Sequence, residues 1–289
     1  MLAASRTGPH AGAPFTLVAG CGDVGSRLAR MLAVRGERVA GLRRSAVALP
    51  EGVEVVRADL ADAASLSALP RGIEQLVFLP TPDARTPEAY RRIFVDGLER
   101  LLDALDGACL AQVVFVSSSA VYGDHAGGWV DEDTPPDPPA FNGQILLEAE
   151  RRLHARVPQA SVLRLAGLYG PGRNGLLQRL RAGKVRVPRA LPFWTNRIHV
   201  EDAAAAIAHV LSLQAPAPLY LGVDRQPLPM HELYDWLAAR LGVGAPAEGP
   251  PPTGIGNKRL SAARLLASGF SPRWPDARTG YASLIDPDR

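Results

Sequence analysis

The sequence predicts a doubly wound α/β fold, in which helices cover both faces of a parallel sheet. Short apolar segments alternate with segments of helical periodicity from residue 15 to residue 123, and this alternation is typical of a parallel sheet buried on both faces. A glycine-rich turn joins the first strand to the first helix. The chain has 289 residues, of which 47% are hydrophobic and 21% charged. Such a composition excludes a disordered or collagen-like protein.

The predicted strands and helices alternate along the first half of the chain. Val24, Leu28 and Leu32 repeat with helical spacing in the first helix, and Gly36 ends it. The apolar runs predict strands at residues 15–20, 37–44, 52–60, 73–80 and 112–123, the last of which continues into a loop. Helices are expected at residues 20–36, 61–69 and 87–105.

Cysteine content and hydropathy exclude several classes of protein. Cys21 and Cys109 are the only cysteines, too few for a disulfide framework or a metal site, so no metal is expected. The N-terminus has no signal-peptide pattern, and no run of about 18 apolar residues could cross a membrane. We therefore expect a cytoplasmic protein without a membrane partner. Lysine is scarce, because Lys184 and Lys258 are the only two.

Charge is unevenly distributed along the chain, although the net charge is only +3. Residues 101–150 hold nine acids and no Lys or Arg, whereas residues 164–197 hold eight basic residues and no acid. Two interpretations of the basic segment stay open: a solvated basic face, or an electropositive wall that attracts phosphate or carboxylate groups. Nucleic acid is not expected as a partner, because the segment has the pattern of strands and loops and not of a recognition helix.

A glycine fingerprint lies between the first strand and the first helix. Gly20, Gly22 and Gly25 have the G-x-G-x-x-G spacing of a dinucleotide site in its usual strand–turn–helix context. The first glycine permits a tight turn, the second lets the backbone approach a pyrophosphate, and the third allows close helix–strand packing. Asp23 and Val24 complete the helix N-terminus that faces the phosphates. The alternative is a glycine-rich turn that fits by chance.

Two arginines follow the second predicted strand and indicate which dinucleotide is bound. An acid at this place binds the 2′-hydroxyl of NAD, whereas an arginine accommodates the 2′-phosphate of NADP. Arg43 and Arg44 lie there, about 20 residues after the fingerprint. The sequence therefore favours NADP over NAD; the alternative is two solvent-facing arginines at a strand end.

Five blocks of sequence resemble the extended short-chain dehydrogenase/reductases, which include the NAD-dependent epimerase/dehydratases of nucleotide sugars. They are the fingerprint, VRADL (56–60), VSSSAVYG (116–123), LRLAGLYGPGR (163–173) and NRIHVEDAA (196–204). The resemblance implies that Asp59 and Leu60 lie at the adenine, that Leu79 and Pro80 lie near the cofactor ribose, and that Ser118 is the catalytic serine.

The tyrosine and lysine pair of that family is missing. The family uses a tyrosine and a lysine four residues apart, so that the lysine lowers the tyrosine pKa for proton transfer. Aligning this chain on Glu150 places Asn142 and Leu146 at those positions. Leu180 and Gly254 precede the two lysines by four residues, so no Tyr-x-x-x-Lys pair exists. The chain therefore resembles an atypical branch of the family.

Other residues of the same blocks are candidates for the missing roles. We predict Ser118 and Tyr122 as catalytic residues, with a neighbouring arginine supplying positive charge; the alternative is that Tyr122 packs structurally and Ser118 only orients a ligand. The family's diphosphate-binding arginine falls at Thr195, and Arg197 lies nearby instead. The predicted substrate-binding residues are Ser119, Arg164, Arg173 and Arg197.

These observations lead to a Rossmann-type fold with a smaller C-terminal lobe. The expected parts are a disordered leader at residues 1–13, a dinucleotide-binding domain at 14–162 and a substrate lobe at 163–289, with part of 196–212 packing back on the Rossmann domain. The leading hypothesis is an NADP(H)-binding oxidoreductase or epimerase/dehydratase-like enzyme for an anionic small molecule such as a sugar or nucleotide sugar. The alternatives are a non-catalytic redox sensor and an anion-binding scaffold. Oligomeric state stays open, with a homodimer as one option.

Overall fold

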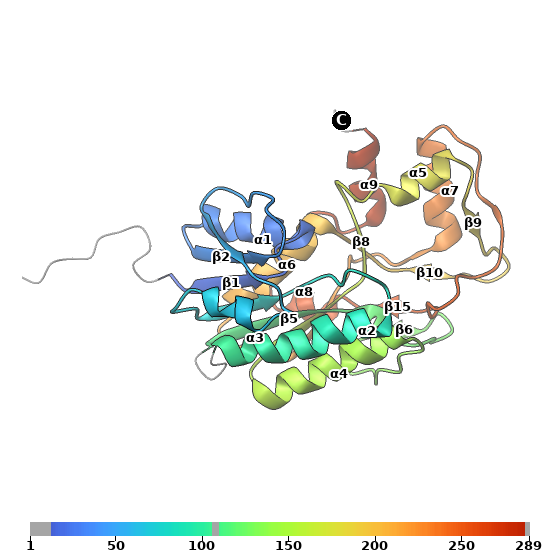
Figure 1. Ribbon diagram of the computed structural model, residues 1–289. Helices are drawn as coiled ribbons and strands as arrows, with labels where there is room; N and C mark the ends of the chain where they lie inside the picture. Colours follow the sequence, from blue (N-terminus) through green and yellow to red (C-terminus); the bar gives the residue numbers. More distant parts are fainter. Residues whose placement is uncertain (1–12, 106–109, 287–289) are drawn as a thin grey trace, which may run out of the picture. The chain divides into compact units, whose positions relative to one another are not determined.

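Figure 1 shows the computed structural model, which describes residues 13–105 and 110–286. Seven strands form a central parallel sheet in the order β12-β7-β5-β4-β1-β2-β3. The strands are β1 (Phe15–Ala19), β2 (Arg38–Arg43), β3 (Val53–Arg57), β4 (Gln75–Phe78), β5 (Gln112–Ser118), β7 (Ser161–Leu165) and β12 (Leu219–Gly222). The predicted doubly wound α/β fold is therefore confirmed. Most of the expected leader lies outside the described residues.

The strand order reverses at β1. The chain runs from β1 through β2 to β3 at one edge, then returns to β4 on the other side of β1 and continues to β5. Val18 of β1 is in register with Gly41 of β2 and with Val77 of β4. Ligands of open α/β sheets bind outside the carboxyl ends of the strands at such a switch point. A ligand site is therefore expected among the segments that follow β1, β2 and β4.

Helices cover both faces of this part of the sheet. Figure 1 shows α1 (Asp23–Val34) on one face and α2 (Pro87–Tyr90) and α3 (Gly97–Leu105) on the other. Leu28 and Leu32 of α1 are fully buried, as the helical period predicted. The central strand β1 is buried along its whole length, as expected for a strand covered on both faces.

Two of the predicted helices differ in detail from the structure. Between α2 and α3 the backbone forms a π-helical segment, η2 (Arg91–Asp96), so residues 87–105 are not one regular α-helix. The segment predicted as a helix at 61–69 contains only a 3-10 helix, η1 (Ala64–Ala68).

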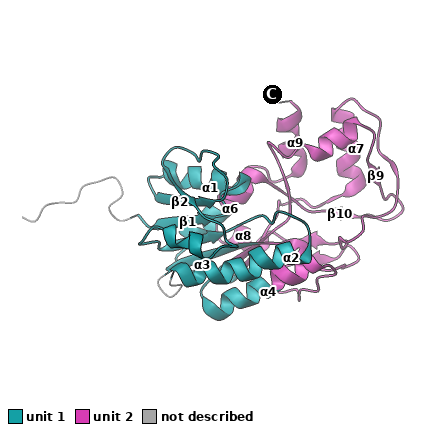
Figure 2. Ribbon diagram, in the orientation of Figure 1, with its two compact units in different colours: residues 1–116, 148–161, 207–218 teal, residues 117–147, 162–206, 219–289 magenta. Residues whose placement is uncertain are grey.

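The chain divides into two compact units, coloured separately in Figure 2. Unit 1 comprises residues 1–116, 148–161 and 207–218, and unit 2 comprises residues 117–147, 162–206 and 219–289. Each unit is therefore assembled from several pieces of chain. The predicted domain boundary after residue 162 stays a prediction, and β7 continues across it to Leu165. Helices α4 (Phe141–Arg156) and α6 (Val200–Ser212) contain residues of both units.

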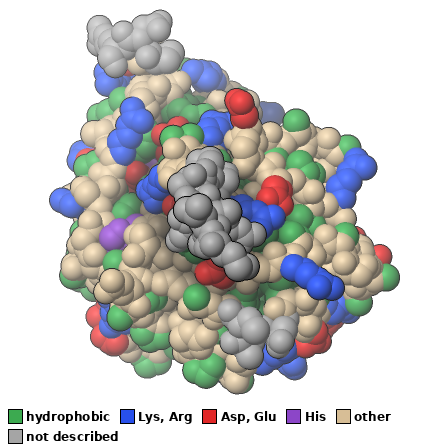
Figure 3. All heavy atoms as spheres, turned by 90° about the vertical axis from the view of Figure 1, so that its left-hand side faces the viewer, with side chains coloured by type: hydrophobic (Ala, Val, Ile, Leu, Met, Phe, Trp, Pro, Cys, Tyr) green, Lys and Arg blue, Asp and Glu red, His purple; other side chains and the backbone are tan. Residues whose placement is uncertain are grey.

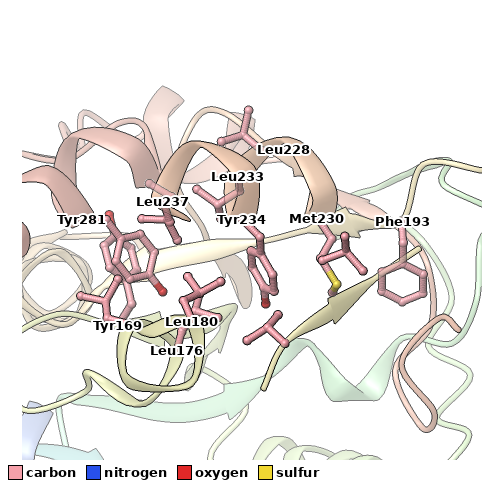
Figure 4. Close-up of a cluster of buried hydrophobic side chains, with 14 residues drawn as sticks. Tyr169, Leu176, Leu180, Phe193, Leu228, Met230, Leu233, Tyr234, Leu237 and Tyr281 are labelled. Carbon is pink, nitrogen blue, oxygen red and sulfur yellow. The ribbon is translucent and has the colours of Figure 1, made fainter. Parts of the chain in front are cut away.

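Unit 2 has a hydrophobic core of its own, drawn in Figure 4. Helices α5 (Gly175–Arg181), α7 (Met230–Arg240) and α9 (Ala277–Ile285) supply most of its residues. Tyr169 stacks on Tyr281 with 4.4 Å between ring centroids.

The remaining elements are β6 (Trp129–Val130), β8 (Gly167–Tyr169), β9 (Arg186–Val187), β10 (Trp194–Thr195), β11 (Arg197–His199), β13 (Leu228–Pro229), β14 (Ala247–Glu248), β15 (Arg259–Leu260), α8 (Ala263–Ala267) and the 3-10 helix η4 (Ser119–Val121). None of the helices in the described residues is long and apolar enough to span a membrane.

Candidate functional site

The backbone turns sharply after β1 at the first glycine of the fingerprint. Gly20 has a φ of +100°, and a Cβ there would lie 2.5 Å from the backbone nitrogen of Pro80. Only glycine fits such a position. The amides of Gly20 and Cys21 donate to the carbonyl of Leu42 at 3.1 and 3.0 Å. A Cβ on Gly22 would meet nothing closer than 3.9 Å, so the loop leaves open space on that side.

Helix α1 begins directly after this loop and lies close to it. A Cβ on Gly25 would lie 2.7 Å from the carbonyl oxygen of Gly20, which is the close helix–strand approach that the sequence predicts for the third glycine. Asp23 is the first residue of the helix, and its carboxylate accepts a hydrogen bond from Nε of Arg27 at 3.0 Å. Val24 is buried. The positive end of the α1 dipole therefore lies at the glycine loop, where it favours an anion.

A cleft of about 420 Å³ lies in unit 1 at the switch point of the sheet. It is lined by Gly20, Cys21, Gly22, Leu42, Arg43, Arg44, Ser45, Ala58, Asp59, Leu60, Pro80, Thr81 and Ile93. Seven of the predicted cofactor residues belong to this lining: Gly20, Gly22, Arg43, Arg44, Asp59, Leu60 and Pro80. The other four, Asp23, Val24, Gly25 and Leu79, are not part of the lining among the described residues.

Positive charge lies at the end of the cleft that follows β2. Nε of Arg43 donates to the hydroxyl of Ser45 at 3.0 Å. Both terminal nitrogens of Arg44 donate to the carboxylate of Asp83, one of them at 2.6 Å to Oδ2. These hydrogen bonds raise the pKa of Arg44 and lower the pKa of Asp83. Both groups therefore stay ionised at neutral pH.

Asp59 is held in place in the cleft by local hydrogen bonds. Its amide donates to the hydroxyl of Ser65 at 2.9 Å, and its Oδ1 accepts from the amide of Ala61 at 2.9 Å. The carbonyl of the next residue, Leu60, accepts from Arg100 at 3.2 Å. The turn after β3 therefore presents a fixed carboxylate side chain to the cleft.

Six lining residues were not singled out from the sequence: Cys21, Leu42, Ser45, Ala58, Thr81 and Ile93. Most lie one or two positions from a predicted strand end or fingerprint glycine, and that adjacency is the signal that could have identified them. Ile93 carries no such signal, because it belongs to the π-helical segment.

Burial raises the pKa of the Cys21 thiol, and the hydrogen bond between this thiol and Ser26 opposes the increase with a smaller effect. The thiol is therefore neutral at physiological pH.

The serine loop that follows β5 belongs to unit 2. Oγ of Ser118 accepts a hydrogen bond from the amide of Ala120 at 3.2 Å and so caps the short helix η4. The carbonyl of Ser119 accepts from the amide of Tyr122 at 3.2 Å. Both serines are half-buried. Their proposed roles in catalysis and substrate binding stay predictions.

Tyr122 and Arg164 lie in contact inside unit 2. The side chain of Tyr122 is 1% exposed, and its hydroxyl accepts from Nη1 of Arg164 at 2.7 Å. The same hydroxyl donates to the carbonyl of Asp131 at 3.0 Å. The guanidinium carbon of Arg164 is 4.9 Å from the ring centroid. The two residues that the sequence selected separately for catalysis and substrate binding thus form one buried pair.

Lys258 is buried next to the same loop. Its ammonium donates to the carbonyls of Tyr122, Gly123 and Gly256 at 3.1, 3.3 and 3.3 Å. Burial lowers the pKa of this lysine. Because an ammonium has three donors, these contacts account for all of its hydrogen-bonding capacity and tie the loop after β5 to the segment before β15.

The basic segment at 164–197 has an internal structure that the sequence did not indicate. It contains helix α5, so the expectation of strands and loops alone was wrong. Arg164 is buried, and Arg197 is half-buried and donates to the hydroxyl of Tyr234 at 3.0 Å. Arg173 is exposed. Figure 3 draws one face of the whole molecule without marking this segment, and on that face Lys and Arg side chains lie among acidic and uncharged ones.

No cluster of three or more His, Cys, Asp or Glu side chains with metal-binding geometry occurs within residues 13–105 and 110–286. Within the described residues, the candidate functional groups are those of the glycine loop, the arginines beside it, and the Ser118–Tyr122 loop. The first two groups belong to unit 1 and the third to unit 2.

A parallel sheet that reverses order at a glycine-rich loop defines the Rossmann-type class of α/β proteins. Within that class, the model of the NAD dependent epimerase/dehydratase family matches residues 16–219, and the chain belongs to this family. The resemblance seen in the five sequence blocks is thereby confirmed at the level of the family.

Three similar proteins illustrate the range of the family. A structure described as a putative NAD-dependent epimerase/dehydratase from Methylobacillus flagellatus is 42% identical, with a TM-score of 0.80 and coverage of 95% of this chain and 98% of that one. A Streptomyces protein named 3-diazoavenalumate denitrifying reductase is 30% identical over 89% of this chain and 86% of its own. The structure of MoeE5 in complex with UDP-glucuronic acid and NAD is 25% identical, with a TM-score of 0.79 and coverage of 94% and 97%.

Proposed function

We propose that this protein binds NADP(H) in the cleft of unit 1 and acts as an oxidoreductase, or as an epimerase/dehydratase-like enzyme, on an anionic small molecule. One observation carries the proposal: the cleft lining combines the first two fingerprint glycines, a fixed aspartate and two adjacent arginines. Membership of a family named for NAD-dependent epimerases and dehydratases supports it.

The residues of the cleft fit the parts of a dinucleotide. The open side of Gly22 and the N-terminus of α1 suit a pyrophosphate, because amide groups and the helix dipole favour an anion there. Arg43 and Arg44 suit a 2′-phosphate, and Asp59 suits a polar edge of the adenosine. When bound, the nicotinamide supplies or accepts a hydride. The protein's own residues bind and orient it.

An anionic substrate is the second part of the proposal. Arg173, which is exposed, and Arg197 are the candidates for holding its charge. The binding of UDP-glucuronic acid by MoeE5 makes a nucleotide sugar a reasonable substrate class. Thr195 argues against a diphosphate held in the family's usual way, and the reductase name of the Streptomyces relative favours hydride transfer to another anionic molecule.

Proton transfer requires a group other than the family's tyrosine–lysine pair. We propose Ser118 and Tyr122, with the charge of Arg164 stabilising a phenolate through their 2.7 Å hydrogen bond. Neither lysine is four residues after a tyrosine. Lys258 is engaged with three carbonyls instead.

A non-catalytic NADP(H) sensor is the second candidate function. The observation that favours it is the environment of Tyr122, whose phenol donates to the carbonyl of Asp131 and whose side chain is almost fully buried. In a sensor, this buried phenol would have a structural role and no part in proton transfer.

The cofactor proposal is tested by titrating NADPH and NADH into the protein and its Arg43→Ala/Arg44→Ala variant. We expect the variant to bind NADPH about 10- to 100-fold more weakly, because charge-assisted hydrogen bonds to the 2′-phosphate are lost. Binding of NADH should change by less than about threefold, since NADH has no such phosphate.

Arg38→Ala is the matched control for this titration, because it removes an exposed arginine of β2 that pairs with Glu54 and is not among the lining residues. An equal loss of both cofactors in the Arg43→Ala/Arg44→Ala variant would contradict the NADP preference. Absence of binding by either cofactor below millimolar concentration would contradict the cofactor site itself.

A further inference from the structure

The ion pair of Arg44 with Asp83 joins two segments that follow different strands. Arg44 comes directly after β2, and Asp83 lies in the loop between β4 and α2. In the sheet order, β1 lies between β4 and β2 and runs parallel to both. A link between the segments after β2 and after β4 therefore passes over the carboxyl end of β1, where the glycine loop begins.

Close contacts fix the start of the β4–α2 loop at this place. The backbone of Pro80 leaves no room for a Cβ on Gly20, and the amide of Leu79 donates to the carbonyl of Ala19 at 2.9 Å. Pro80 and Thr81 line the same cleft as Arg43 and Arg44. The Arg44–Asp83 pair thus bridges two walls of the cleft across its glycine loop.

The carboxylate of Asp83 occupies the donors of Arg44 that a phosphate would use. Both terminal nitrogens of the guanidinium donate to Asp83, in the two-pronged geometry that arginine forms with carboxylates and phosphates alike. Arg92 adds a weaker contact to Asp83 at 3.5 Å. The side chains of Arg44 and Asp83 are 48% and 45% exposed, so water and a soluble anion can reach the pair.

We infer that Asp83 is a built-in competitor for the 2′-phosphate, which must displace this carboxylate from Arg44 when NADP(H) binds. The inference rests on the proposed function, because it concerns the same cleft. Arg44 is then paired with the carboxylate of Asp83 in the free protein and with the 2′-phosphate in the complex. Loss of the Arg44–Asp83 pair frees the β4–α2 loop from the β2 side of the cleft. Asp83 thereby sets how strongly the protein prefers NADP(H) over NAD(H).

The test uses Asp83→Asn in the full chain, with adenosine 2′,5′-bisphosphate and adenosine 5′-monophosphate as probes in calorimetric titrations. Asparagine keeps the shape of the side chain and removes its charge. Because exposed ion pairs are weak, we expect the bisphosphate to bind about two- to fivefold more tightly to the variant. Binding of the monophosphate, which lacks the 2′-phosphate, should change less than twofold.

Two further variants control the experiment. Glu54→Gln breaks the similarly exposed Arg38–Glu54 pair of the same sheet, so it should leave both probes unchanged. In an Arg44→Ala background, Asp83→Asn should lose its effect on the bisphosphate. Unchanged or weaker bisphosphate binding by Asp83→Asn alone would overturn the inference, and weaker binding would make Asp83 a positioning residue for Arg44. If the unmodified protein binds neither probe, the proposed function itself fails.

Discussion

Asp224 is a buried carboxyl group of unit 2 that is only partly hydrogen-bonded. Its Oδ1 accepts from the amide of Gln226 at 3.3 Å, whereas its Oδ2 has no hydrogen-bond partner among the described residues. Burial raises the pKa of Asp224 to about 8; Asp276 adds to this effect and Arg197 opposes it. Because its unfolded-state pKa is about 3.9, the folded protein binds more protons than the unfolded chain between these two values. Stability contributed by this group is therefore complete below about pH 4 and is lost as the pH rises toward 8.

The Asp224→Asn variant tests this linkage at a single residue. We expect the unfolding free energy of the unmodified protein to fall relative to that of the variant by at least about 1 kcal/mol between pH 5 and pH 8. Urea unfolding at several pH values measures the difference. Asp137→Asn, which changes an exposed carboxylate of the same unit, should show no such trend. A pH-independent difference for Asp224→Asn would refute the linkage.

At the scale of elements, one buried ammonium group links two segments whose paired strands are short. β15 and β6 are two-residue strands, and Arg259 and Leu260 are in register with Trp129 and Val130. Lys258 lies directly before this pair and binds the loop after β5 through the carbonyls of Tyr122 and Gly123. Its third contact is with the carbonyl of Gly256 in its own segment. Short strands contribute little stability alone, so the contacts of the buried cation add to the backbone hydrogen bonds between these segments.

Replacing Lys258 by methionine should destabilise unit 2. The change keeps most of the aliphatic side chain but leaves three carbonyls without their donor, which costs about 2–4 kcal/mol. Lys184→Met is the matched control, because Lys184 is the only other lysine and is exposed; it should change stability by less than about 0.5 kcal/mol. Equal urea midpoints for the two variants would show that the carbonyl contacts of Lys258 are not stabilising.

Local sequence patterns predicted where helices and strands occur better than they predicted the internal geometry of each helix or strand. The apolar residues between 87 and 105 correctly indicate a helical region, but the π-helical turn at Arg91–Asp96 leaves no mark in residue type that periodicity can detect. Helix α5 was missed because it is short and lies between glycines and prolines, which are typical of loops. Tertiary packing of Leu176, Leu177 and Leu180 into the core of unit 2 stabilises it instead.

For the whole molecule, the sheet and the glycine loop were predictable because their signals lie within a few residues of each other. The alternation of strands and helices predicts the parallel sheet, the fingerprint predicts the glycine loop, and Arg43 and Arg44 directly follow the second predicted strand. Asp83 was not predictable as the partner of Arg44, because 39 residues separate them. The carbonyl contacts of Lys258 extend over 136 residues. Such pairings depend on how the folded chain brings distant segments together, and local sequence patterns do not show it.

An experiment on the complete protein distinguishes an enzyme that transfers hydride from a sensor that only binds the cofactor. If Ser118 and Tyr122 support catalysis, NADPH deuterated at its hydride-donating carbon should pass the label to a carbonyl compound in a panel of anionic substrates, followed by mass spectrometry. Ser118→Ala should lower this rate about 10- to 100-fold, because one acid–base group is lost, while NADPH affinity stays unchanged. Ser118→Thr, which keeps a hydroxyl, should restore part of the rate. Retention of the label in NADPH throughout the panel, in a protein that binds NADPH, would favour the sensor over the enzyme.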